Sequence, residues 1–379
     1  MIGEYHLRVS GKLRTASIVL LGLATLIAVV LALPVADWRT GQGDIELLSL
    51  APAGAHAVTA RRIWIDTDAA CGAGRTTDPD DCLALLALLK APGMRVVGIS
   101  TIFGNATIGV TDRTTRDLVS LLATEGFPTP PVFRGRSSSL DANYAVDQTP
   151  ADNGMRDALS EAPMIIVALG PLTNVAAVLR SHPALAPQVQ GIVSVMGQRP
   201  GHVFHPVEGG AARILFGHGP VFKDFNFAKD RLAAAELLAR GIRMTFVPYE
   251  AAQALTITET DLNAMARAGS AARWVADRSR EWLSFWHQDI RQPGFFSFDL
   301  AAAVYLLHPE LFRCAQVRHR IGKHSWFWRW MLGDTGLFVE QLIDGKQDKS
   351  GHRAVYCPSA SAGIHEAALA DLTLTLRPR

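Results

Sequence analysis

Residues 63–68 read IWIDTD, an apolar run that ends in two aspartates. A short run of β-branched and aromatic residues indicates a buried β-strand. Nine mostly small or polar residues follow at 69–77, and a second acidic group, Asp78-Pro79-Asp80-Asp81, comes after them. Carboxylates gathered at the end of a buried strand repel one another unless a cation or a proton relieves them. The stretch therefore indicates a cation site, for which a hard divalent metal is the simplest occupant.

The chain around this stretch alternates between apolar runs and helical patterns. Such alternation predicts parallel strands joined by right-handed helical crossovers, in a sheet that is covered on both sides. We therefore predict an α/β fold with a mostly parallel central sheet and helices on both faces. The expected strands are 62–66, 95–103, 164–169, 191–196 and 243–248, and the expected helices are 81–90, 112–125, 172–180 and 231–240.

Polar residues follow three of the expected strands. Asp66 and Asp68 end the first strand, Gly104-Asn105 end the second, and Gly170 follows the third. Ligands of α/β sheets bind at the carboxyl ends of the strands, so we expect these turns to open on one rim. Segment 197–223 is rich in Gly, Pro and His without periodicity, and we expect a long loop there that covers the rim.

The last part of the chain has a different pattern. From Val317 onward, short β-like pieces occur at 326–330, 354–357 and 372–376. We expect a small antiparallel annex there, near the C-terminus of a domain that spans residues 61–379.

The composition fits a large folded protein with no polyanionic partner. The 379 residues are 49% hydrophobic and 19% charged, which is enough apolar material for a sizeable core. Lys+Arg 37 against Asp+Glu 35 gives a net charge of +2. A balance this close to neutral argues against nucleic acid as a partner.

The N-terminus carries an apolar segment. Residues 16–34 are almost entirely Leu, Val, Ile and Ala, and Arg8, Lys12 and Arg14 precede them. This pattern is typical of a signal-anchor or a signal peptide, so we assign residues 1–35 to a membrane anchor or signal segment and 36–60 to a linker. A retained anchor is favoured by the length, although Ala55-His56-Ala57 offers a cleavage site. Either reading predicts an extracytoplasmic protein, whereas a buried core helix is the less favoured alternative.

Export makes the four cysteines interpretable, because an oxidising compartment permits disulfides. Cys71 and Cys82 bracket the segment inside the acidic cluster, whereas Cys314 and Cys357 lie in the C-terminal part. Of the three possible pairings we favour Cys71 with Cys82 and Cys314 with Cys357. Four free thiols remain the alternative.

Six motifs span roughly residues 61–312. They are Asp66-Thr67-Asp68 with Asp80-Asp81, the GISTIFGN segment at 98–105, LGPLTN at 169–174, VMG at 195–197, DFN at 224–226 and FDLAA at 298–302. Together, and in this order, they resemble the motifs of a known family, the inosine-uridine preferring nucleoside hydrolases.

The resemblance implies a Ca²⁺-dependent N-ribohydrolase that cleaves a ribonucleoside into ribose and free base. It assigns the proton-accepting base to Asp68. By the same resemblance the calcium ligands are Asp68, Asp81, Asp299 and the carbonyl of Leu169. The ribose-binding positions implied are Asp80, Asn105, Asp224 and Asn226.

General chemistry makes sense of these residue types. Calcium takes about six to eight oxygen ligands, which carboxylates, a carbonyl, water and sugar hydroxyls can supply. Glycosidic cleavage builds positive charge on the sugar, which carboxylates and amides stabilise. The bland alternative for Asp66 and Asp80 is turn formation or helix capping. For Asn174, at the start of an expected helix, a capping role is favoured over a ligand role.

Three departures from the family pattern bear on activity. The family closes its opening motif in a few residues, whereas Ala69–Thr77 intervene here and either displace Asp80 and Asp81 or loop out. Asp224 stands where the family typically has Glu. Phe298 stands where many members have a His that protonates the departing base. A phenyl ring has no proton to give but can stack on a base, which favours purine nucleosides.

Other aromatic and histidine residues have two readings each. Trp282, Phe285, Trp286 and His287 either line a base pocket or form a packing stripe, and packing is favoured. Trp326, Trp328 and Trp330 share one face of an expected strand, which suits either core or a membrane interface. In the long loop, His205 or His218 is the sharpest replacement for the missing acid.

Two further classes of function remain open besides the hydrolase. A non-catalytic nucleoside- or sugar-binding protein would keep the fold and lose turnover. A haloacid-dehalogenase-like phosphatase also begins with Asp-x-Asp after a strand, but Ala70 and the lysine-poor middle of the chain argue against it. The partners expected for the hydrolase are a small ribonucleoside, the membrane through the N-terminal segment and a second copy of the chain in a homo-oligomer.

Overall fold

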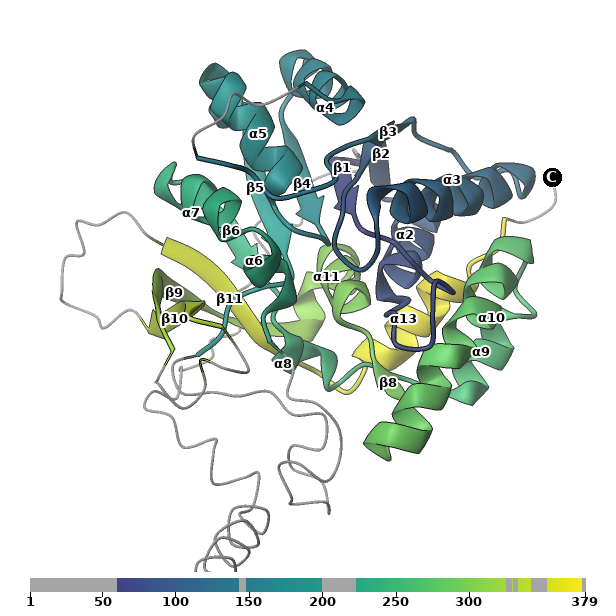
Figure 1. The fold of residues 1–379 in the computed structure, drawn as a ribbon. Coiled ribbons are helices and arrows are strands. Elements are labelled where there is room, and N and C mark those ends of the chain that lie inside the picture. Colours follow the sequence, from purple (N-terminus) through teal and green to yellow (C-terminus); the bar gives the residue numbers. More distant parts are fainter. Residues whose placement is uncertain are drawn as a thin grey trace, which may run out of the picture.

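A computed structural model of the protein describes residues 60–142, 148–199, 223–324, 329, 333–341 and 353–376. Its centre is a nine-stranded sheet in the order β10-β9-β11-β6-β5-β4-β1-β2-β3 (Figure 1). The strands are β1 (Arg61–Thr67), β2 (Met94–Thr101), β3 (Val132–Arg134), β4 (Met164–Ala168), β5 (Val189–Ser194), β6 (Met244–Phe246), β9 (Phe312–Lys323), β10 (Thr335–Gln341) and β11 (Arg353–Ala360).

Helices pack on both faces of this sheet, as predicted (Figure 1). The α-helices are α2 (Asp80–Lys90), α3 (Ile108–Thr124), α4 (Pro150–Glu161), α5 (Thr173–Ser181), α6 (Phe225–Lys229), α7 (Arg231–Ala239), α8 (Tyr249–Ala252), α9 (Glu259–Met265), α10 (Ser270–Phe285), α11 (Phe298–Leu307) and α13 (Ile364–Thr373). A π-helical turn, η3 (Trp286–Ile290), extends α10, and short 3-10 turns lie at Pro183–Gln188 and Pro309–Leu311.

The central strand β1 separates two hydrophobic cores. Its side chains alternate, because successive residues of a strand point to opposite faces. Ile63 and Ile65 enter the core shared with α2, α3, α10 and α11, whereas Trp64 enters the core shared with α4, α5 and α7. Both faces are dry, which explains why this strand reads as one apolar run rather than as an alternating one.

Helix α2 is buried on every side. All of its residues from Asp80 to Lys90 are buried, including the two aspartates that begin it. A helix that is apolar all round belongs in the interior of a large domain, and the leucine- and alanine-rich sequence of α2 meets that condition. The start of α2 therefore carries two carboxylates into the protein interior.

The strand order reverses at β1. The chain runs from β1 to β2 and β3 on one side, then returns to place β4, β5 and β6 on the other side. The pairs β1–β2 and β1–β4 are parallel, with Asp66 opposite Ser100 and Ala168. The crevice at such a switch point is where open α/β sheets bind ligands, and the carboxyl ends of β1 and β4 form its floor here.

The C-terminal annex is an extension of the main sheet. β9 pairs antiparallel with β10 and β11, and β11 lies parallel to β6. The expected piece 354–357 falls within β11, whereas the expectation of a strand at 372–376 is wrong, because α13 continues to Thr373. Strand β9 is the longest of the sheet, and a disulfide joins its Cys314 to Cys357 of β11. A second, two-stranded antiparallel sheet pairs β7 (Thr256–Ile257) with β8 (Phe295–Phe296).

Several sequence predictions fall outside the described residues. They concern the N-terminal apolar segment 16–34, the linker, the tryptophans at 326, 328 and 330, and the histidines at 205 and 218. Within the part of the chain that the structure describes, no helix combines the length and the apolar character that a membrane span requires.

Candidate metal and substrate site

A cavity of about 440 Å³ opens at the carboxyl ends of the central strands. Its walls come from the ends of β1, β4 and β5, from the first turns of α2, α6 and α11, and from α10. Lys223 is the single basic side chain among the described residues that line it. The lining comprises Asp68, Thr76, Thr77, Asp78, Asp80, Asn105, Leu169, Val195, Met196, Lys223, Asp224, Phe225, Asn226, Tyr249, Trp282, Phe298 and Asp299.

Three buried aspartates meet at one end of the cavity. Carboxylate oxygens of Asp80, Asp81 and Asp299 lie within 4.8 Å of one another. The Oδ1 atom of Asp299 is buried and accepts no hydrogen bond from any described residue. A buried carboxylate oxygen without a donor is costly, and a cation is the partner that satisfies it. The donor set, all oxygen and all anionic, fits a hard divalent metal.

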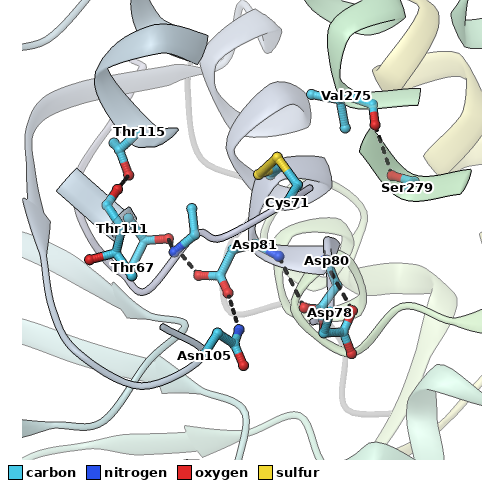
Figure 2. The surroundings of a disulfide bond; sticks show 12 residues. Thr67, Cys71, Asp78, Asp80, Asp81, Asn105, Thr111, Thr115, Val275 and Ser279 are labelled. Carbon is cyan, nitrogen blue, oxygen red and sulfur yellow. Dashed lines mark hydrogen bonds between the residues drawn. A yellow bond between two sulfur atoms is a disulfide. The ribbon is translucent and has the colours of Figure 1, made fainter. Parts of the chain in front are cut away.

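Asp81 is fixed at the bottom of this group. Its Oδ1 accepts hydrogen bonds from the hydroxyl of Thr67 and from the backbone N–H of Asp68, at 2.5 and 3.1 Å. Its Oδ2 accepts a bond from the side-chain amide of Asn105 at 3.0 Å. Figure 2 shows Asp81 between Thr67 and Asn105. These donors come from the ends of β1 and β2, so the two strands hold the orientation of a side chain on α2.

Asp68 lies beside this group, pressed between two glycines. Its Oδ2 accepts a hydrogen bond from the backbone N–H of Asn105 at 2.7 Å. A Cβ atom on Gly104 would stand 1.8 Å from that oxygen, and a Cβ on Gly170 would stand 3.0 Å from Oδ1. Only residues without a side chain allow the carboxylate to sit this close to both turns. The two glycines therefore set the place of Asp68.

Asp80 links the two helices that supply the cluster. Its Oδ2 accepts hydrogen bonds from the backbone N–H groups of Phe298 and Asp299, each at 3.0 Å. These are the first residues of α11, whose own preceding residue Ser297 makes no side-chain cap. Asp80 thus caps α11 from a distance of more than 200 residues in sequence and fixes the position of Asp299.

Burial and mutual repulsion raise the pKa values of the carboxyl groups in the cluster. Burial raises the pKa of Asp68, Asp78 and Asp299 well above the usual value, and neighbouring carboxylates add to the effect. Burial raises the pKa of Asp81 to about 6, the charge of Asp80 adds to it, and the bond from Thr67 opposes it. A bound cation lowers such pKa values, because it favours the charged forms.

Asp66 belongs to the supporting layer beneath the cavity. It is fully buried, and its Oδ1 accepts hydrogen bonds from Ser100 and from the side chain of Asn174 at 2.8 Å. The capping role predicted for Asn174 is wrong. Its amide instead ties together the ends of β1 and β2 by donating to Asp66 and to the carbonyl of Thr101. Burial raises the pKa of Asp66 to about 7.

The opposite wall holds the motifs near residues 169 and 224. The side-chain amide of Asn226 donates to the carbonyls of Leu169 and Val195, at 2.6 and 3.2 Å. Asp224 caps α6 by accepting from the N–H of Phe227, and it also accepts from the N–H of Gly197 at 2.7 Å. Burial raises the pKa of Asp224 to about 6. The structure thus brings these residues to the cavity and joins two of them directly.

Aromatic side chains also line the cavity. Phe298, Tyr249 and Trp282 contribute to the wall, and Trp282 stacks on Phe285 with ring centroids 5.2 Å apart. The sequence left open whether the aromatic residues near 282–287 line a base pocket or pack in the core, and the structure shows one example of each. Trp282 faces the cavity, whereas Trp286 is fully buried and packs edge-on against Phe296.

The segment 69–77 does not displace the acidic residues. It loops out beside the Cys71–Cys82 disulfide, with Gly72, Ala73, Arg75 and Thr76 exposed. Asp80 and Asp81 still begin α2 and meet Asp299, as the motif requires. A disulfide between Cys71 and Cys82 fastens the segment to α2, which is the pairing favoured from sequence. Thr76 and Thr77, at the end of the segment, line the cavity.

Some residues of the predicted motifs have a role that the sequence did not assign. Thr67, Asp78 and Gly104 stood within the predicted motifs, and the structure shows that each of them shapes the site. Thr67 lies between Asp66 and Asp68 in the sequence, and its hydroxyl donates a hydrogen bond to Asp81. Asp78 accepts a bond from the N–H of Asp80 at 3.1 Å (Figure 2).

Fold and site together define an α/β protein with a metal-binding acidic pocket at the switch point of its sheet. The sequence profile of the inosine-uridine preferring nucleoside hydrolases matches residues 63–329, which is more than half of the chain. The chain belongs to this family.

Individual relatives are more distant. Probable uridine nucleosidase 2 of Oryza sativa subsp. japonica is 24% identical over 298 residues, covering 71% of this chain and 81% of the relative. Non-specific ribonucleoside hydrolase RihC of Escherichia coli is 26% identical over 261 residues, covering 62% of this chain and 79% of the relative.

Solved structures share the fold at low identity. The plant nucleoside hydrolase PpNRh1 superposes with a TM-score of 0.64 at 21% identity, covering 83% of this chain and 99% of that one. A purine-preferring ribonucleoside hydrolase from Gardnerella vaginalis gives 0.62 at 17% identity, covering 83% and 98%.

Membership of this family defines the enzyme class. The protein is an N-ribohydrolase, a glycosidase that hydrolyses ribonucleosides, and the family is metal-dependent. The phosphatase alternative is therefore wrong. The Asp-x-Asp motif after a strand is present, but the family that matches the chain is one of nucleoside hydrolases.

Proposed function

We propose that this protein uses Ca²⁺ to hydrolyse the N-glycosidic bond of ribonucleosides, with a preference for purine nucleosides. One observation carries the proposal. Asp80, Asp81 and Asp299 converge in a buried group at the end of a cavity that Asp68 also lines, and one oxygen of Asp299 has no donor among the described residues. The all-oxygen donor set suits calcium, which accepts irregular oxygen coordination.

The residues proposed to hold the ion are Asp68, Asp81, Asp299 and the carbonyl of Leu169. Asp81 and Asp299 belong to the buried cluster, and Asp68 lies next to Asp81 through its backbone hydrogen bond. The Leu169 carbonyl faces the side chain of Asn226, which donates to it. When bound, the ion lowers the pKa of a coordinated water and makes it a better nucleophile.

Asp68 is the proposed general base. Its carboxylate lines the cavity, and Gly104, Gly170 and the N–H of Asn105 hold it in one position. A base must lie within hydrogen-bond reach of the proton that it accepts, and a fixed carboxylate at the cavity floor meets that requirement for a water bound there. The proton moves from this water to a carboxylate oxygen of Asp68 as the water attacks the anomeric carbon. The C–N glycosidic bond breaks in exchange, and the base departs with the bonding electrons and takes up a proton from solvent.

Asp80, Asn105, Asp224 and Asn226 are proposed to hold the ribose. All four line the cavity: Asp80 begins α2, Asn105 follows β2, and Asp224 and Asn226 lie at the start of α6. Positive charge develops on the sugar ring as the glycosidic bond breaks. Carboxylates and amide oxygens near the ring bind this charge more strongly than they bind the neutral ground state, which lowers the barrier.

The base is proposed to stack on Phe298. The ring lines the cavity directly beside Asp299, whose N–H is held by Asp80. A phenyl ring offers a flat apolar surface, and a purine presents the larger area to it. This is the ground for the proposed purine preference.

A ribonucleoside panel with metal control tests the proposal. The purified protein is treated with a chelator and assayed for released ribose with inosine, guanosine, adenosine, uridine and cytidine, before and after adding back Ca²⁺ or Mg²⁺. Hydrolysis that is lost on chelation, restored by Ca²⁺ and faster for the purine nucleosides supports it. Full activity with the chelator present contradicts the calcium requirement, and faster hydrolysis of uridine and cytidine contradicts the purine preference.

We also propose that the protein acts outside the cytoplasm, tethered by the N-terminal segment. The apolar stretch 16–34 behind three basic residues supports this, as do two disulfides among the described residues. Membrane and soluble fractions of cells that express the full chain separate the outcomes. Full recovery in the cytosolic fraction, with reduced thiols, contradicts the proposal.

A further inference from the structure

We infer that the segment Ala69–Thr77 is a wall of the substrate pocket that recognises the nucleobase, and that Thr76 and Thr77 make the specific contacts with the edge of the base. This inference rests on the proposed function and names a substrate contact of the same site. The segment separates the two halves of the acidic motif, and it ends against the cavity.

The first half of the segment is built into the core. Ala69 and Ala70 are fully buried and Cys71 is 3% exposed, next to the disulfide with Cys82 on α2. A turn follows, closed by the backbone bond from Ala73 to the carbonyl of Ala70 at 3.0 Å. Figure 2 shows Cys71 at α2, with the acidic residues Asp80 and Asp81 at the start of the same helix.

The middle of the segment is fastened to α10 and η3. Arg75 makes an ion pair with Asp289 and a hydrogen bond to Gln288 at 3.0 Å, and its guanidinium lies 5.6 Å from the ring of Phe285. Gly72 adopts a left-handed conformation with its Cα against the side chain of Arg278, where a Cβ would come within 2.7 Å. The segment therefore bridges α2 and α10 at several points and is a fixed wall.

The last residues of the segment connect its contact with α10, made by Arg75, to the acidic residues at the start of α2. Asp78 reaches the acidic end, because it accepts from the N–H of Asp80. Thr76 and Thr77 precede it, on the side that runs toward α10, and a turn bond from the N–H of Thr77 to the carbonyl of Gly74 at 3.1 Å fixes them. α10 contributes Trp282 to the same cavity.

The distribution of polar groups assigns the base to this side. A ribose needs the carboxylates and amides, so its position is set by Asp80, Asn105 and Asn226. The base then occupies the remaining space, whose lining includes aromatic and aliphatic side chains, Lys223 and the two threonines. A hydroxyl both donates and accepts hydrogen bonds, which matches the mixed edge of a nucleobase.

Hydrogen bonds in such a pocket discriminate strongly. A site that pairs with a polar group of one base leaves its own group unpaired when another base binds. Thr76 and Thr77 therefore act on the ratio between nucleosides rather than on the chemical step. They are specificity-determining residues, separate from the carboxylates that bind the metal.

The test replaces the hydroxyls by methyl groups. Thr76→Val, Thr77→Val and the double variant are compared with the wild-type protein for kcat/KM on inosine, guanosine, adenosine, uridine and cytidine. Thr124→Val, on the exposed side of α3, is the matched control. Affinity for free ribose and for the free bases hypoxanthine and uracil is measured in parallel by calorimetry.

Loss of a hydrogen bond to the base should change the ratio of kcat/KM between nucleosides by about 3- to 10-fold in the double variant. The affinity for a free base should fall by a similar factor, while the affinity for ribose stays as in the wild-type protein. An equal loss for every nucleoside, a weakened ribose affinity or no change at all overturns the inference.

The two readouts separate this inference from the proposed function. If the wild-type protein hydrolyses no nucleoside but the valine variants weaken binding of a free base, the proposed function fails and the base wall stands. If the wild-type protein is active and neither the kcat/KM ratio nor base binding responds to the variants, the base wall fails alone.

Discussion

The two sides of the cavity are built in different ways. The acidic side is assembled from strand ends and helix starts of the parallel sheet, and its carboxylates hold one another through Thr67, Asn105 and backbone N–H groups. The aromatic side is assembled from the segment 69–77 and from α10. A disulfide joins the segment to α2, an ion pair joins it to η3, and Arg75 lies over the ring of Phe285 on α10. The acidic side thus belongs to the sheet and its helices, whereas the segment 69–77 is an insertion that is fastened to α2, α10 and η3.

The difference separates reaction chemistry from substrate choice. Carboxylates that share one cation must be placed together, and hydrogen bonds from neighbouring elements hold Asp68, Asp80 and Asp81 in position. A surface that selects a base needs a complementary shape and a few polar groups. A segment that a disulfide anchors to a helix can supply both. Changes on the acidic side are thus expected to abolish turnover, and changes on the aromatic side to redirect it.

The largest effect is expected for Asp68→Asn. The amide keeps the size of the side chain but cannot accept the proton of the attacking water, so kcat should fall by about 100- to 10,000-fold. Asp277→Asn, on the exposed surface of α10, is the matched control and should leave kcat unchanged. Circular dichroism should show both variants folded. A folded Asp68→Asn variant with an unchanged rate would remove Asp68 from the role of base.

Asp299→Asn should weaken calcium binding by about 100-fold or more, because it removes a charged ligand from the buried group. Without metal the same variant should be more stable than the wild-type protein, since it relieves repulsion with Asp80 and Asp81. Calorimetric titration with Ca²⁺ and urea unfolding in chelator measure the two effects. Calcium affinity equal to that of the wild-type protein would place the ion elsewhere.

Gly104→Ala tests the placement of Asp68 without altering any carboxylate. The new methyl group would stand 1.8 Å from Oδ2 of Asp68, so the side chain or the turn must move. A displacement of this size should lower kcat by about 100-fold. Gly109→Ala is the control, because its Cβ meets nothing within 4 Å, and it should behave as the wild-type protein does. Equal rates for the two variants would contradict the account of the site.

The smallest effect concerns pH and the opposite wall. The pKa of Asp224 rises from 3.8 to about 6 on folding because the group is buried. The folded protein therefore keeps this proton between pH 4 and 6 while the unfolded chain releases it. The contribution of Asp224 to the free energy of unfolding should fall as pH rises through that window, by up to about 3 kcal/mol, and stay low above it.

Asp224→Asn should lack this part of the pH dependence. Urea unfolding in chelator at several pH values between 4 and 7 compares the variant with the wild-type protein. The wild-type curve should lose stability more steeply with rising pH than the curve of the variant. Parallel curves would show that Asp224 titrates alike in the folded and unfolded chain.

Much of the fold could be predicted from sequence because its signals are local. The runs around Ile63, Val96 and Ile166 each read as buried strands, and each lies in the parallel part of the sheet. Segment 372–376 failed for the same reason that short apolar runs often fail. Its alternation of Leu and Thr resembles a strand, but packing of Ile364 and Leu372 into the core makes the preceding stretch a helix.

The site was predictable as a set of residues and not as an arrangement. Asp299 was expected to share a calcium ion with Asp81 by resemblance to the family. The hydrogen bonds by which Asp80 caps α11 were not expected, and they join residues 218 and 219 positions apart. Asn174 was expected to cap a helix from its position in the chain. It bridges Asp66 and Thr101 instead, since the turns after β1 and β2 need a buried donor there.

The sequence by itself determined the α/β class, the oxygen-rich donor set and the family, because apolar periodicity and motif order are written along the chain. The tertiary structure alone decided that the segment 69–77 keeps Asp80 and Asp81 in place and ends as a wall of the cavity. The physical reason is that two of its anchors, Arg278 on α10 and Asp289 on η3, are close to it only after the helices have packed. Contacts of that kind have no local signature, so only the folded molecule reveals them.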